Sequence, residues 1–94
     1  MESLFEKWLI ETEKVSESST EKYVRSIRAV SKDMITEGVI TQSLYKVKSY
    51  DTYCGLMNRI FENKFFIDKN ERGNRMYSSA MKKYEKFLRA FCGK

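Results

Sequence analysis

Residues 18–40 read SSTEKYVRSIRAVSKDMITEGVI, and this stretch decides the fold. Its first four residues, Ser18 to Glu21, match the S-x-x-E capping box, in which two side chains satisfy free amides at a helix start. Gly38 stands where a glycine ends a helix, and Val39-Ile40 can fold back over the last turn. Between these ends, apolar residues recur at steps of three and four, which predicts one long amphipathic helix: Tyr23, Ile27, Val30 and Met34.

Shorter helical patterns lie on both sides of this helix. Apolar residues from Leu4 to Leu9 predict a first helix, with Ser3 as its N-cap, that runs to about Lys14. The serine-rich residues 15–19 then form a loop. After the long helix, a short helical turn is expected from near Ser43. A further helix, capped by Asp51 or Ser49, has its own apolar face: Tyr53, Leu56, Met57 and Ile60.

The C-terminal third predicts a loop and a last helix. Phe65-Phe66-Ile67 is an apolar cluster expected to anchor the turn-forming residues 68–74. A helix is expected from near Arg75 to a terminating Gly93, with a wide apolar face: Tyr77, Ala80, Met81, Tyr84, Phe87, Leu88 and Phe91. Proline is absent and glycine occurs only four times, too few for the turns of an all-β domain. The sequence therefore predicts one all-α domain over residues 1–94, a single four- to five-helix bundle.

The residue types that carry most catalysis and metal binding are missing. There is no histidine, and the glycines are too isolated to form a phosphate-binding loop. Cys54 and Cys92, thirty-eight positions apart, fit no zinc-finger spacing. No apolar run has the length of a membrane span, and the N-terminus lacks the basic region of a secretory signal. We therefore expect a cytoplasmic protein with reduced thiols, no enzymatic activity, no metal and no other cofactor.

Charge is distributed unevenly along the chain. Residues 1–21 hold six acids and two bases, a net charge of −4, whereas residues 22–94 hold seven acids and sixteen bases, a net charge of +9. A body this basic attracts a polyanion, of which nucleic acid is the usual one. The alternative is that the lysines and arginines only keep a small protein soluble.

The spacing of the basic residues favours the first reading. At 100° per residue, Lys22, Arg25, Arg28 and Lys32 fall within about 120° of arc, opposite the apolar face of the second helix. Arg75, Lys82, Lys86 and Arg89 fall within about 60° on the last helix. A solvated face usually mixes Glu with Lys, whereas rows of one sign cost helix stability. We therefore predict phosphate contacts through these two rows.

The start of the last helix is a further candidate for phosphate binding. Arg72 and Arg75 flank residues 73–74 there, and a helix N-terminus offers free amides and a positive dipole end. The alternative reading of this segment is a simple turn in which Asn74 caps the helix.

Two segments carry a resemblance to known families. The first is Phe5-Glu6-Lys7-Trp8-Leu9, followed by Ser18-Ser19-Thr20 and Tyr23, and it resembles the opening of the core-binding domain of tyrosine recombinases (phage integrases). The second, residues 74–88, NRMYSSAMKKYEKFL, is similar to the end of small helical N-terminal regions on some bacterial restriction endonucleases. The resemblance implies a SAM-like helical bundle that binds duplex DNA. The recombinase catalytic signature is absent, so no cleavage or strand exchange is implied.

Two functions follow as expectations. The first is a non-catalytic module that grips the backbone of double-stranded DNA, as part of an integrase or restriction system or as a free-standing phage or mobile-element protein. The alternative is a protein-interaction module, such as a small phage-type regulator that binds a host protein or associates with itself. Its acidic first helix and basic body would then meet charged partners.

Overall fold

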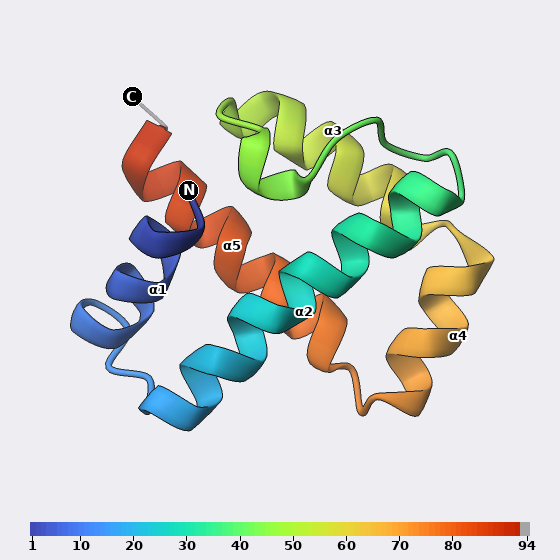
Figure 1. Ribbon diagram of the computed structural model, residues 1–94. Helices are drawn as coiled ribbons and strands as arrows, with labels where there is room; N and C mark the ends of the chain where they lie inside the picture. Colours follow the sequence, from blue (N-terminus) through green and yellow to red (C-terminus); the bar gives the residue numbers. More distant parts are fainter. Residues whose placement is uncertain (93–94) are drawn as a thin grey trace.

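The computed structural model describes the backbone of residues 1–92 and the side chains of residues 1–91. This part of the chain contains five α-helices, one 3-10 turn and no β-strand (Figure 1). In chain order they are α1 (Glu2–Glu11), α2 (Glu17–Thr36), the 3-10 turn η1 (Leu44–Lys46), α3 (Tyr50–Phe61), α4 (Lys64–Arg72) and α5 (Met76–Cys92). The expected all-α bundle of four to five helices is confirmed.

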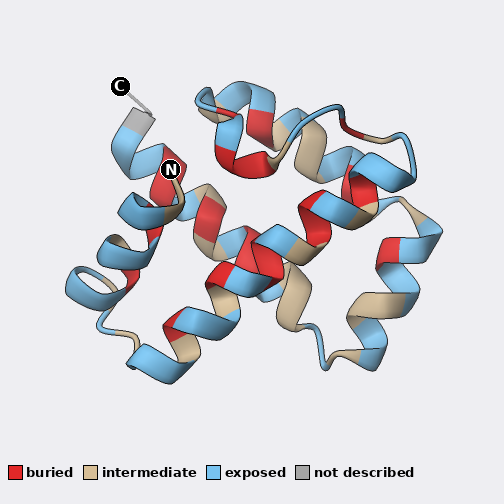
Figure 2. Cartoon of the chain, viewed as in Figure 1, coloured by how far each residue is buried: buried red, intermediate tan, exposed pale blue. Residues whose placement is uncertain are grey.

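The bundle is built around the crossing of α2 and α5. In Figure 1, α2 runs diagonally across α5, with α1 on one side of the pair and α4 on the other. The molecule is flat, with principal extents of 34 × 29 × 16 Å. Each helix turns its apolar stripe inward, so the red buried segments of Figure 2 gather where the helices meet.

The end of α2 is set by Gly38, as the sequence predicts. Gly38 has a φ of +77°, a conformation that glycine adopts without a Cβ penalty. Its N–H donates to the carbonyl of Ile35 (3.1 Å), and the N–H of Val39 donates to the carbonyl of Met34 (2.9 Å). This pair of bonds is the Schellman motif. It turns the chain back so that Ile40 is buried in the core.

Two hydrogen bonds then hold η1 against α2. The side chain of Ser31 accepts from the N–H of Leu44 (3.0 Å), and the hydroxyl of Tyr45 donates to the carbonyl of Val24 (2.9 Å). Ser43 caps the turn, which confirms the short helical element expected there. Of the two caps expected for α3, Asp51 and Ser49, the structure shows Ser49.

Aromatic rings form the centre of the core. Phe5 of α1 is fully buried, and its ring centroid lies 4.9 Å from that of Tyr84 and 5.5 Å from that of Phe87 on α5. Trp8, the single tryptophan, is half-buried beside Phe87 at 5.7 Å. The rings of Tyr45 and Tyr84 are in edge contact at 5.3 Å. Ring-to-ring packing therefore joins α1, η1 and α5.

Two expected N-caps are wrong. The cap of α2 is Ser16, whose Oγ accepts from the N–H of Ser19 (3.3 Å), and the predicted capping box from Ser18 lies inside the helix. Thr20, in the first turn of α2, is buried. Met1 takes the N-cap position of α1, so Ser3 is helical, and α1 ends at Glu11 instead of near Lys14.

The expected loop over residues 68–74 is wrong, because most of it belongs to α4. Asn63 caps this helix by accepting from the N–H of Phe66 (3.0 Å), and Phe66 is buried in stacking contact with Phe61 (5.5 Å). A cap and one anchored ring outweigh the turn-forming tendency of the polar residues that follow. Phe65 and Ile67, expected to share the anchoring, are exposed. The true turn is confined to residues 73–75.

Cysteine chemistry is described only in part. The thiol of Cys54 is free, as expected, and lies 3.9 Å from a carboxylate oxygen of Glu85. The side chain of Cys92 and the predicted helix end at Gly93 lie outside the described residues.

Candidate nucleic-acid interface

The two predicted cationic rows lie on opposite faces of the bundle. We call Lys22, Arg25, Arg28 and Lys32 the α2 row, and Arg75, Lys82, Lys86 and Arg89 the α5 row. The apolar faces of α2 and α5 are buried in one shared core cluster. A helix that turns its apolar side toward a neighbour turns its charged side away from it. The two rows therefore point away from each other, and no single flat surface can contact both.

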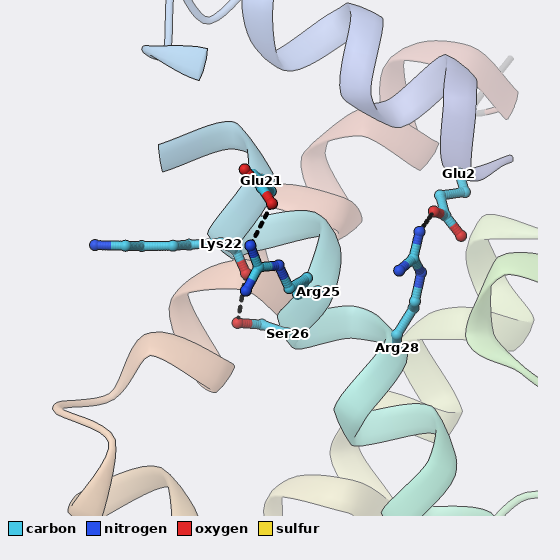
Figure 3. Close-up of polar contacts among 6 residues, drawn as sticks. All are labelled: Glu2, Glu21, Lys22, Arg25, Ser26 and Arg28. Carbon is cyan, nitrogen blue, oxygen red and sulfur yellow. Dashed lines mark hydrogen bonds and ion pairs between the residues drawn. The ribbon is translucent and has the colours of Figure 1, made fainter. Parts of the chain in front are cut away.

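Carboxylates of the N-terminal region occupy the centre of the α2 row. Arg25 is ion-paired with Glu21 and Arg28 with Glu2 of α1, as Figure 3 shows. Arg28 donates a hydrogen bond to the carboxylate of Glu2, and this bond raises the pKa of its guanidinium. Lys22 extends away from both arginines in the same view. Lys32, also exposed, has no ion pair among the described residues. The α2 row is thus interrupted by negative charge.

All four residues of the α5 row are exposed. Lys82, Lys86 and Arg89 lie on one face of α5, whereas Arg75 belongs to the turn that precedes the helix. Within the described part of the chain, Arg75 and Lys82 take part in no ion pair. Arg89 lies over the ring of Tyr50 (5.8 Å from its guanidinium carbon to the ring centroid) and donates to its hydroxyl (3.4 Å). The contact with Tyr50 orients Arg89 without neutralising it.

Lys86 is the member of the α5 row that has an acidic partner. Its Nζ lies 2.9 Å from Oε2 of Glu13, whose other oxygen is 2.8 Å from Nζ of Lys83. The Glu13 side chain is only 11% exposed, while that of Lys86 is 62% exposed. Hydrogen bonds from Lys83 and then Lys86 lower the pKa of Glu13. Nothing in the spacing of the sequence indicated this bridge, because it joins residues seventy positions apart.

Replacing Glu13 with glutamine is expected to lower the melting temperature by roughly 5 °C at neutral pH. Since the pKa of Glu13 is lowered on folding, its carboxylate stabilises the protein above the ordinary pKa of glutamate. That stabilisation is lost as the pH falls through the lowered value. Thermal melts of both proteins from about pH 7 to about pH 2 measure the effect. The two curves should converge in acid, and a gap that widens there would contradict the assignment.

The start of α5 is capped from another helix. The side-chain oxygen of Asn70 on α4 accepts from the N–H of Ser78 (2.9 Å). The expected cap by Asn74 is therefore wrong, and Asn74 and Arg75 instead form the turn with φ values of 56° and 63°. Arg72 is exposed beside Asp68 and Glu71, which line a surface hollow with it. Arg72 therefore lies beside two acids. At the start of α5, where a phosphate could bind free amides, the N–H of Ser78 is already bonded to Asn70.

The buried tyrosines have structural hydrogen bonds. The hydroxyl of Tyr53 donates to the carbonyl of Met81 (2.7 Å), and burial raises its pKa well above the ordinary value. Burial also raises the pKa of Tyr45, which donates to a backbone carbonyl of α2. A phenol held protonated in this way supports packing between helices and is poorly suited to proton transfer near neutral pH.

Comparison with known proteins adds no relative. No protein-family model matches the chain, and no curated protein or solved structure matches it. Among the described residues, no three or more Cys, Asp or Glu side chains are grouped so that they could hold a metal ion. None of the described helices has the length and apolar character needed to cross a membrane.

Proposed function

We propose that this domain binds double-stranded DNA through the phosphate backbone, using the α5 row. The observation that carries the proposal is the exposure of three cations on one face of α5 and of Arg75 in the turn before it; Arg75 and Lys82 have no acidic partner among the described residues. Phosphates lie close together along a duplex, so such a group of cations can meet several of them. The α2 row is left out, because it points to the opposite face and is interrupted by carboxylates.

The chemistry of the row suits phosphate. Arg75 and Arg89 each offer a planar guanidinium that can donate two hydrogen bonds to one phosphate group. Lys82 and Lys86 add compact charges between them. Lys86 can turn toward a phosphate while Lys83 keeps its bond to Glu13, since Lys86 is the more exposed of the two lysines. Backbone contacts carry little sequence information, so we expect modest specificity.

The sequence resemblance supports the same proposal. The helical core-binding domain of tyrosine recombinases and the N-terminal regions of some restriction endonucleases both precede catalytic parts that act on DNA. We propose a SAM-like arrangement of the bundle and a non-catalytic role as the DNA-binding part of an integrase or restriction system. The compact all-helical architecture is compatible with that role.

A duplex titration at two salt concentrations tests the proposal. Fluorescence anisotropy of a labelled random duplex of about 20 base pairs should show micromolar or tighter binding at low salt. With about four phosphates neutralised, the slope of log K against log salt should be about −3.6. A rise from about 50 mM to about 200 mM salt should then weaken binding roughly a hundredfold. If the duplex does not bind at low salt, DNA is rejected as the partner, and the alternative function, a protein-interaction module, is favoured.

A further inference from the structure

An open groove lies between α4 and the first turns of α5, beside the turn that joins them. The two helices diverge from this turn (Figure 1). The groove has a volume of about 320 Å³, at the lower end of the range of about 300–1,000 Å³ that is usual for small-molecule sites. It brings together apolar side chains of α3 and α4 with two cations of the α5 row: Phe61, Phe66, Ile67, Arg75 and Lys82.

The apolar part of the groove is accessible from solvent. Ile67 is 40% exposed, and Phe61 is half-buried. The ring of Phe61 is stacked on the buried ring of Phe66, with 5.5 Å between the ring centroids and 19° between the ring planes. This stacking fixes the orientation of Phe61. The groove therefore offers a preorganised apolar surface to a ligand.

The charges around the groove favour an anion. Arg75 and Lys82 are exposed and form no ion pair within the described part of the chain. Glu71 is the single acid among the described residues that line the groove, so the cations outnumber it. Because Arg75 and Lys82 also belong to the α5 row, the groove is continuous with the proposed DNA surface. The ligand that fits combines an apolar part with negative charge beside it.

We propose that this groove receives an unpaired base from the end of a bound DNA strand, while Arg75 and Lys82 bind the phosphates next to that base. The inference rests on the proposed function, since the two cations are shared with the α5 row. A base inside a duplex must be unstacked and unpaired before it can leave, whereas a base in a single-stranded overhang avoids most of that cost. Packing of the base against Phe61 and Ile67 does not depend on its identity, because every base has an apolar face. The domain therefore prefers duplexes with single-stranded ends to blunt ones.

Fluorescence anisotropy at one low salt concentration tests the preference. The probes are a blunt duplex, the same duplex with short thymine overhangs (on the 3′ or on the 5′ ends), and the same overhangs built from abasic residues. At least one thymine overhang should bind about fivefold or more tightly than the blunt duplex. The abasic overhangs carry the same phosphates without the bases, and they should bind like the blunt duplex.

The outcomes separate this inference from the proposed function. If the blunt duplex binds and no thymine overhang binds more tightly than its abasic equivalent, the inference is rejected and the proposed function stands. If a thymine overhang binds and the blunt duplex does not, the groove is supported and the proposed duplex binding is rejected. Absence of binding to all probes rejects both.

Two variants on α4 assign the preference to the groove. Ile67→Ala removes apolar surface from the groove, so it should lose most of the preference for the thymine overhang. Phe65→Ala is the matched control, because Phe65 is 44% exposed on the same helix and does not line the groove. The control should keep the preference, and circular dichroism should show both variants folded. If Ile67→Ala keeps the preference, the base binds elsewhere and the inference is rejected. If a capped acidic peptide with one phenylalanine binds the parent but not Ile67→Ala, and no overhang preference is found, the groove belongs to a protein partner instead.

Discussion

Replacing Phe5 with alanine is expected to lower the free energy of unfolding by about 3–5 kcal/mol, enough to leave much of the protein unfolded at 37 °C. Phe5 is 0% exposed, and its ring contacts Tyr84 and Phe87 of α5 as well as Tyr45 of η1. Removing it opens a cavity at the one point where α1, η1 and α5 meet. Tyr45, one of the neighbours of that space, is held by a hydrogen bond to the carbonyl of Val24 in α2, which opposes its movement into the cavity.

Urea denaturation followed by circular dichroism measures this loss. Phe65→Ala is the matched control, because it makes the same chemical change on a side chain that is 44% exposed. The control should lose less than about 1 kcal/mol. Equal losses in the two variants would show that the aromatic cluster around Phe5 does not dominate the core.

Combining Lys82→Glu with Lys86→Gln is expected to weaken duplex binding by more than tenfold at low salt. The pair lowers the charge of the α5 row by three units, two at Lys82 and one at Lys86. Glutamine is chosen at Lys86 because a carboxylate there would face Glu13, whose bond to Lys83 has to survive. Two fewer phosphate contacts should also reduce the slope of log K against log salt by about two.

The control for this experiment is built on the other face. Lys22→Glu with Lys32→Gln makes the same change of three charges in the α2 row, at two exposed lysines without ion pairs among the described residues. If the proposal is right, the control keeps most of its affinity and its salt slope. Equal weakening of the two double variants would mean that net charge alone, and not the α5 row, governs binding. Circular dichroism of both variants should match that of the parent.

The sequence predicted the parts of the fold that depend on local signals. The apolar repeat of α2 and its terminating Gly38 act within a few residues, and both are confirmed. The predicted start of α2 was wrong because the chain offers several serines in succession that could cap a helix, and Ser16 is the one whose Oγ accepts from the N–H of Ser19. The helix at 64–72 was missed because its stability comes from one cap and from a ring buried against another helix.

The candidate site was less predictable than the fold. Helical periodicity applies to Lys82, Lys86 and Arg89, which are exposed on α5, but not to Arg75, which lies in the turn before the helix. It could not show that the apolar faces of α2 and α5 meet, which sends the two rows to opposite sides. Nor could it show which acids reach which cations, since Glu2 meets Arg28 and Glu13 meets Lys83 only after the chain has folded. These pairings depend on tertiary contacts that no local spacing encodes.

The position of Trp8 has a practical consequence. It is the single indole of the chain, and it sits on α1 with one ring of α5 directly beside it. Its fluorescence therefore reports on the packing of α1 against α5. Far-ultraviolet circular dichroism, by contrast, reports on the helix content of the whole protein. A spectral red shift that preceded the loss of ellipticity would identify α1 as the first segment to detach, without any label having been added.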